Sequence, residues 1–76
     1  MSFGEEIRNM RYALLLSQDK FAKQLGVVAY TVNSWENGRS LPGTNSMASL
    51  QQFFEKNGIE TDTILRIWKE EIEKRN

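Results

Sequence analysis

The sequence has no cysteine, no histidine and a single proline. Without cysteine the chain cannot form a disulfide, hold a metal through thiolates or use a thiol as a nucleophile. Without histidine it also lacks the commonest general base and the commonest metal ligand. Only scattered carboxylates remain for catalysis, so we expect no enzyme, no metal site, no other cofactor and no small-molecule substrate.

Long apolar runs and an excess of charge are missing as well. No run approaches the roughly 20 apolar residues that span a bilayer, and the first residues do not form a signal peptide. We therefore expect a soluble, cytoplasmic protein with no membrane partner. Ten basic residues balance ten acidic ones. Because nucleic-acid affinity comes mainly from Lys and Arg beside phosphates, any such contact must depend on a local patch.

Apolar residues recur at helical spacing throughout the chain, and no segment shows the alternation of a strand. Seventy-six residues suffice for one domain, 1–76, with an all-α fold of five helices. Thr44 or Asn45 is expected to cap the fourth helix. The predicted helices cover about 3–15, 17–25, 28–37, 45–56 and 61–75.

Capping signals mark the first two helices. Ser2 and Glu5 have the spacing of a capping box, and the Ser17 hydroxyl can cap the second helix. Gly26 permits the left-handed backbone that ends a helix abruptly. The second and third helices are too short to be stable alone and must dock on a common core. This arrangement is a helix-turn-helix, in which the second helix of the pair meets the major groove of DNA.

The combined pattern resembles the lambda-repressor/Cro-like, or XRE-type, helix-turn-helix domains. The match covers about 5–58, and 59–76 forms an additional C-terminal helix. The matching residues are Ile7, Arg11, Leu14, Leu16, Ser17, Gln18, Ala22, Leu25, Gly26, Val27, Thr31, Val32, Trp35, Glu36, Asn37, Gly38, Arg39 and Pro42. The resemblance implies a compact five-helix bundle that binds double-stranded DNA in its major groove. It also implies a homodimer on a two-fold operator, of bacterial, phage or mobile-element origin.

The resemblance assigns base-reading positions to the third helix. Ala29, Tyr30 and Ser34 match outward positions that usually meet base edges, and Thr31 and Asn33 match neighbouring positions that take phosphate or base contacts. Asparagine can pair with adenine, and alanine can contact a thymine methyl.

Phosphate contacts are implied on either side of that helix. Gln18 matches a residue that holds a phosphate at the start of the second helix and can brace the third. Asn37 and Arg39, which follow the third helix, match residues that commonly meet phosphate.

Arg11 lies at the edge of the apolar stripe of the first helix, so its charge needs a partner. In the family the matching residues form a largely buried ion pair, which here would join Arg11 to Glu36. The fifth helix has a wider apolar face than an outer helix needs. That face is either a dimer contact through Ile67, Trp68 and Ile72 or a cover over the first and fourth helices.

Together these features predict a sequence-specific DNA-binding transcriptional regulator, acting as a dimeric repressor by steric occlusion. The alternative is a protein-interaction module, such as an antitoxin or an adaptor, that keeps the fold but binds DNA weakly or not at all. The zero net charge favours the alternative, as does the absence of Arg, Lys and Gln from 28–34. The fifth helix would then be the partner surface.

Overall fold

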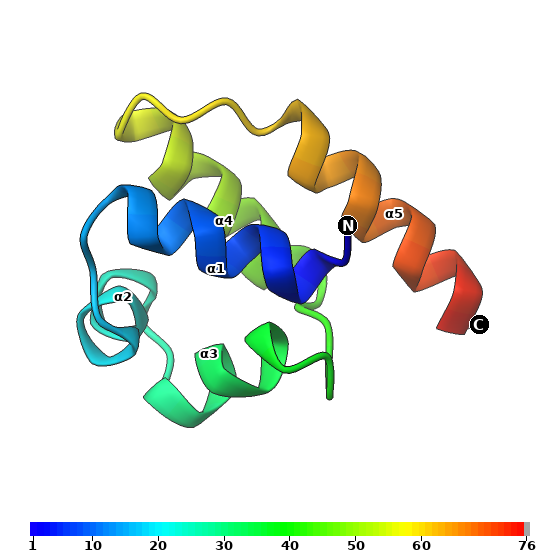
Figure 1. Cartoon of the computed structure of the whole chain (residues 1–76), viewed down its shortest axis with the longest axis horizontal. Helices are drawn as coiled ribbons and strands as arrows, with labels where there is room; N and C mark the ends of the chain where they lie inside the picture. Colours follow the sequence, from blue (N-terminus) through cyan, green and yellow to red (C-terminus); the bar gives the residue numbers. More distant parts are fainter. Residues whose placement is uncertain (76) are drawn as a thin grey trace.

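The computed structural model describes residues Met1 to Arg75. In this range the chain forms five α-helices joined by turns and loops, and no strand (Figure 1). The helices are α1 (Phe3–Ala13), α2 (Gln18–Leu25), α3 (Ala29–Glu36), α4 (Thr44–Lys56) and α5 (Asp62–Arg75). The all-α prediction from helical periodicity is therefore confirmed. No helix in this part of the chain is long and apolar enough to cross a membrane.

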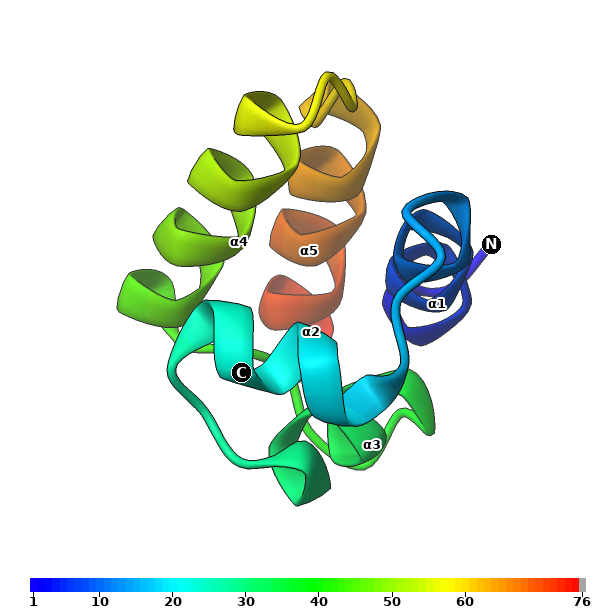
Figure 2. The ribbon, with the colours of Figure 1, turned by 90° about the vertical axis from the view of Figure 1, so that its left-hand side faces the viewer.

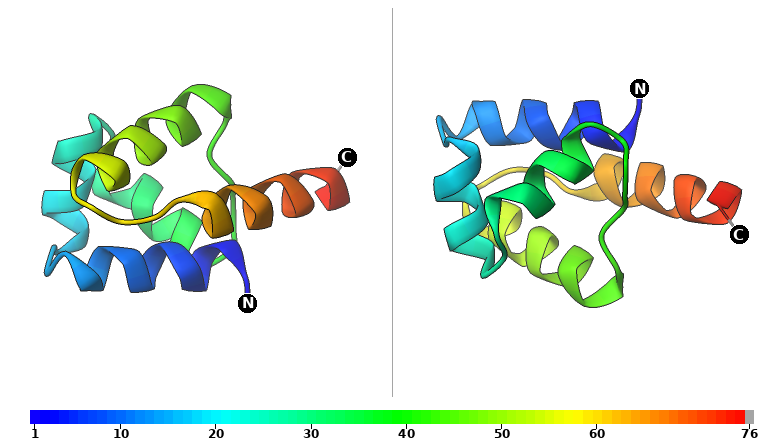
Figure 3. Two further views of the ribbon diagram at one scale, coloured as in Figure 1. Left: turned by 90° about the horizontal axis from the view of Figure 1, so that it is seen from above. Right: turned by 90° about the horizontal axis from the view of Figure 1, so that it is seen from below.

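The helices pack in pairs around one centre. α1 packs on α3 and α5, and α2 packs on α3 and α4. α2 and α3 lie together on one side of α1, α4 and α5 (Figure 2). Viewed from that side, α3 lies in front of the rest of the molecule (Figure 3, right). The bundle thus presents α3, together with the start of α2, along one face.

The predicted caps of the first two helices are confirmed. Ser2 and Glu5 form a reciprocal capping box, and the Ser17 hydroxyl accepts from the backbone N–H of Lys20 at 3.1 Å. Gly26 ends α2 with a φ of +73°, a conformation that glycine adopts without steric cost.

Two predicted helix ends are wrong. α1 stops at Ala13 rather than near residue 15, because Leu15 takes a left-handed φ of +58° and turns the chain. The turn lets the N–H of Leu16 bond the carbonyl of Arg11 at 3.3 Å. At α4, neither Thr44 nor Asn45 is the cap. Gly43 is the N-cap residue and makes no side-chain capping hydrogen bond. The helix begins at Thr44, one residue earlier than the predicted start at residue 45.

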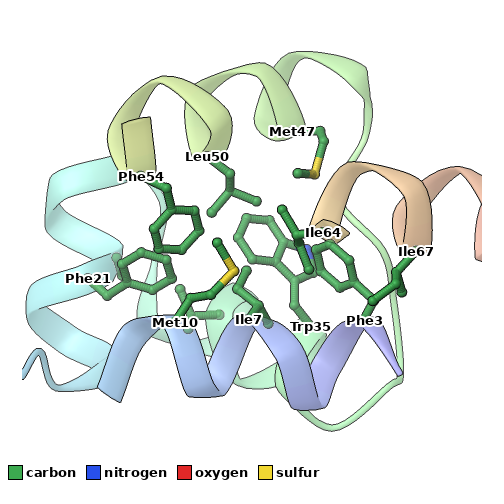
Figure 4. Close-up of a cluster of buried hydrophobic side chains, with 12 residues drawn as sticks. Phe3, Ile7, Met10, Phe21, Trp35, Met47, Leu50, Phe54, Ile64 and Ile67 are labelled. Carbon is green, nitrogen blue, oxygen red and sulfur yellow. The ribbon is translucent and has the colours of Figure 1, made fainter. Parts of the chain in front are cut away.

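The core lies between the helices and contains residues from all five of them (Figure 4). Phe21 of α2 packs on Phe53 and Phe54 of α4, with ring centroids 5.7 and 5.6 Å apart. The core side chains are Phe3, Ile7, Met10, Phe21, Ala22, Val32, Trp35, Met47, Leu50, Phe54, Ile64 and Ile67.

The apolar face of α5 packs largely against the rest of the chain. Ile67 is only 8% exposed and belongs to the core, so the prediction that it forms a dimer contact is wrong. Trp68 is half-buried, and its indole N–H donates to the carbonyl of Pro42 at 2.8 Å. Ile72 is also half-buried. Most of the apolar face of α5 therefore covers the helix bundle.

A close approach between α1 and the end of α3 depends on a glycine. A Cβ on Gly4 would lie 2.5 Å from the carbonyl oxygen of Glu36 and 2.7 Å from that of Trp35. Backbone atoms cannot move aside as the end of a side chain can, so only glycine fits at this crossing.

We expect Gly4→Ala to destabilise the protein by about 2–3 kcal/mol, because overpacking against backbone is not relieved by a rotamer change. For a domain of this size the melting temperature should fall by roughly 10–20 °C, measured by circular dichroism. The control is Asn9→Ala on the exposed side of α1, which should leave melting nearly unchanged. Equal melting of the two variants would contradict the close approach.

Candidate nucleic-acid interface

The first half of α3 is turned toward solvent. Val32 and Trp35 are 0% and 3% exposed and fix the helix on the core, which leaves the opposite side free. Tyr30 is 69% exposed and Val28, just before the helix, is 67% exposed. The side chain of Val28 makes no capping hydrogen bond, so the amides of the first turn of α3 remain unpaired by a side chain.

The predicted base-reading residues do not all lie on this free side. Ala29, Thr31 and Asn33 are half-exposed around Tyr30. Ser34 is 8% exposed, and its hydroxyl shares a 2.8 Å hydrogen bond with the hydroxyl of Ser40. The expectation that Ser34 faces outward is therefore wrong, because this serine holds the loop after α3 against the helix.

Arg11 and Glu36 form a buried, bidentate ion pair between α1 and the end of α3. The Nε and Nη2 atoms of Arg11 donate to the two Glu36 carboxylate oxygens at 2.6 and 2.9 Å. The residues are 5% and 4% exposed. The Nη1 atom of Arg11 donates to the carbonyl of Leu16 at 2.7 Å, so the turn after α1 completes the site. No buried side-chain nitrogen or oxygen among residues 1–75 lacks a partner.

Gln18 joins α2 to this pair. Its Nε2 donates to Glu36 Oε1 at 3.0 Å, and its Oε1 accepts from Asn33 Nδ2 at 3.4 Å. The Arg39 guanidinium donates to Asn33 Oδ1 at 3.1 Å. A chain of hydrogen bonds thus runs from Arg39 through Asn33 and Gln18 to Glu36 and Arg11. It fixes the start of α2 relative to the exposed side of α3.

The charges of this network stabilise each other. Burial by itself raises the pKa of Glu36, but hydrogen bonds from Arg11 and Gln18 and the charges of Arg11 and Arg8 outweigh it, so the pKa lies below its ordinary value. The hydrogen bond with Glu36 raises the pKa of Arg11, against the opposing effect of burial. Both groups are therefore ionised at neutral pH.

The residues expected to contact phosphate lie beside the C-terminal half of α3. Gln18 is half-buried at the start of α2, where the first-turn amides have no partner within the helix. Asn37 and Arg39 are exposed after α3. The Asn37 amide group donates to the carbonyl of Asn33 at 2.9 Å, which closes the end of the helix.

Two further arginines lie beside the end of α3, and sequence reasoning did not identify them. Arg8 Nη2 donates to the Glu36 carbonyl at 3.1 Å, and its Nε lies 3.5 Å from Glu36 Oε1. Arg75 Nη2 donates to the Gly38 carbonyl at 3.1 Å. The spacing of Arg8 and Arg11, one turn apart on α1, is a signal for Arg8. No local pattern points to Arg75, because it comes from α5.

The described residues contain no group of three or more acidic, cysteine or histidine side chains placed to hold a metal. Apart from the buried Glu36 carboxylate, the polar side chains around α3 carry amides, hydroxyls and guanidiniums. Such groups suit hydrogen bonding to nucleic-acid bases and phosphates.

One comparison with known proteins found a relative. The chain is 32% identical over 54 residues to the HTH-type transcriptional activator BcrR of Enterococcus faecalis. The match covers 71% of this chain but only 26% of the relative, so the chain spans about a quarter of that protein. Comparison with models of protein families gave no match, and neither did comparison with solved structures.

Replacing Glu36 by Gln should cost about 3 kcal/mol of unfolding free energy at neutral pH, because Arg11 keeps a buried charge without a counter-ion. The wild-type carboxylate stabilises the fold above its unfolded pKa, near 4.5, and this contribution disappears as pH falls through the lower folded pKa. The difference between the two proteins should therefore shrink below about pH 4.5. Urea titrations at neutral and acidic pH measure it.

The control for this titration is Glu70→Gln, which removes a carboxylate from an exposed pair with Arg66. That variant should differ from wild type by less than about 0.5 kcal/mol at either pH. A Glu36→Gln deficit that stays constant down to pH 3 would contradict the role assigned to the ion pair.

Proposed function

We propose that this chain binds double-stranded DNA by placing α3 in the major groove, and that it acts in the regulation of transcription. The observation that carries this proposal is the rigid mounting of α3. One face of the helix is fixed on the core and braced through Glu36 and Gln18, while Tyr30 and its neighbours stay free. The relative that is named an HTH-type transcriptional activator supports the same conclusion.

Base reading falls to the free side of α3. The Tyr30 ring can lie on sugar or thymine methyl groups, and Ala29 is small enough to contact a methyl. Asn33 can pair with adenine once its long 3.4 Å hydrogen bond to Gln18 is released. Thr31 is the fourth of these proposed base-contacting residues. We call Ala29, Tyr30, Thr31 and Asn33 the reader; none of the four carries a charge.

Phosphate binding is assigned to groups beside the C-terminal half of α3. Gln18, which bonds Asn33 and Glu36, and the amides of the first turn of α2 bind from α2, where the dipole of that helix also favours an anion. Asn37 and Arg39 bind from the residues that follow α3. These contacts fix the register of α3 in the groove without reading sequence.

The finer proposal is a lambda-repressor-like domain that binds a two-fold operator as a homodimer. A dimer would place two α3 helices about 34 Å apart, one turn of the duplex. Because Ile67 lies in the core, the proposed dimer contact is reduced to Trp68 and Ile72, which are half-buried on α5. Repression by occlusion stays a prediction. The relative is named an activator, and both modes require the same docking of α3.

One observation favours the alternative of a protein-interaction module. Leu15 is 92% exposed, and its neighbour on the last turn of α1, Tyr12, is 57% exposed. Solvent-facing side chains of this size are typical of contact surfaces when they cluster. They lie at the turn between α1 and α2, not on α5.

Fluorescence anisotropy with labelled duplex DNA tests the DNA-binding proposal. Binding should weaken steeply with salt, because each phosphate contact releases counterions. Tyr30→Ala should lower affinity on the order of tenfold, the scale of one good base contact, with an unchanged melting temperature. Tyr12→Ala is the matched control: it removes an exposed tyrosine from α1 whose ring lies 4.7 Å from the Arg11 guanidinium, and where its melting temperature is unchanged it should bind as wild type does.

No binding by the wild-type chain at low salt would overturn the proposal and leave the interaction module. Equal loss in the Tyr30 and Tyr12 variants would show that α3 is not the reader. Titration to saturation gives the stoichiometry, which should be two chains per operator.

A further inference from the structure

Three arginines from separate parts of the chain converge on the C-terminal end of α3. Arg8 of α1 donates to the Glu36 carbonyl, Arg39 of the following loop to Asn33 Oδ1, and Arg75 of α5 to the Gly38 carbonyl, each at 3.1 Å. We call Arg8, Arg39 and Arg75 the arginine cluster. The chain as a whole is neutral, so the fold concentrates positive charge here.

The cluster keeps most of its charge and its donors. Among residues 1–75 its ion pair is with Glu36, but Arg11 neutralises Glu36 at 2.6 Å while Arg8 lies 3.5 Å away. The other acceptors are neutral oxygens. A guanidinium has five N–H donors, and the contacts made here occupy only a few of them. Arg39 and Arg75 are exposed, so their free donors face solvent.

α5 holds Arg75 in place at this end. Trp68 donates to the Pro42 carbonyl at 2.8 Å, and Glu71 accepts from the backbone N–H of Phe3 at 2.7 Å. Positions 68, 71 and 75 recur at helical spacing and lie on one side of α5. That side therefore contacts both the loop after α3 and the start of α1, and it fixes the last turn of α5 beside Gly38.

We propose that Arg75, together with Arg39 and Arg8, binds a phosphate of the DNA backbone at the C-terminal end of α3. This inference rests on the proposed function and extends it, because it makes α5 part of the DNA-binding surface. A reader without charge needs cations from elsewhere to gain affinity, and the cluster supplies them. A guanidinium can bind phosphate through two parallel hydrogen bonds. Gln18, which bonds Asn33 and Glu36, offers a further donor to the backbone from the start of α2.

The test measures anisotropy of a fluorescein-labelled random duplex across salt concentrations, with wild type, Arg75→Gln, Arg75→Lys and Arg66→Gln. Arg66 lies on α5 but pairs with Glu70, so its variant removes the same charge outside the cluster. Arg75→Gln should reduce the slope of log K against log salt by about 0.9. The wild-type advantage should then shrink roughly 3.5-fold between 50 and 200 mM salt. Arg75→Lys and Arg66→Gln should keep the wild-type slope.

The outcomes separate this inference from the function on which it rests. A wild-type chain that does not bind DNA overturns both. Salt-dependent wild-type binding with an unchanged slope in Arg75→Gln overturns only the role of Arg75. A lowered melting temperature in both Arg75 variants, with unchanged slopes, would assign Arg75 to holding the loop and would also overturn the proposal.

Discussion

The Glu36 carboxylate lies where α1, α2 and α3 meet, and it accepts hydrogen bonds from Arg11 and Gln18. Each of these donors comes from a different helix, so one anion fixes the mutual orientation of three helices. Apolar packing alone tolerates small rotations of one helix on another. A bidentate guanidinium–carboxylate pair does not, because both its distances and its plane are set. The direction in which α3 faces solvent is thus fixed by a buried interaction at the C-terminal end of the helix.

Several separate elements contact the end of α3 and the loop after it. Gly4 brings α1 against its last carbonyls, Ser34 and Ser40 hold the loop that follows, and the Trp68 indole reaches the loop from α5. The beginning of α3 is different, since Val28 supplies no cap and Tyr30 is free. This asymmetry fixes the last turn of the helix on the protein scaffold and leaves the side chains at its beginning free to contact a ligand. We propose that the ligand is DNA.

Local sequence signals predicted much of this structure. Helical periodicity gave the five helices, and the Ser2–Glu5 box, Ser17 and Gly26 marked helix ends because capping depends on residues that are neighbours in the chain. The pairing of Arg11 with Glu36 followed from the family resemblance, supported by the position of a charge beside an apolar stripe.

Several errors and omissions arose where the deciding contact is made outside the residue's own helix. Ser34 matched an outward position, but the loop bearing Ser40 folds back over it. Ile67 lies on a face of α5 wide enough for two roles, and only the position of α1 decides between them. Gly4 and Arg75 depend on crossings with α3 and its loop that no local pattern encodes.

The hydrogen bond from the Phe3 amide to Glu71 joins positions 68 residues apart. Closing so long a segment is entropically costly and tends to occur late in folding. During synthesis on the ribosome, α1 to α4 would leave the exit tunnel before Glu71 is available. Until α5 docks, the start of α1 would be held mainly by its contacts with α3. Docking of α5 would then complete the attachment of α1. A nascent chain halted before α5 would lack Ile64 and Ile67, which share the core with Phe3.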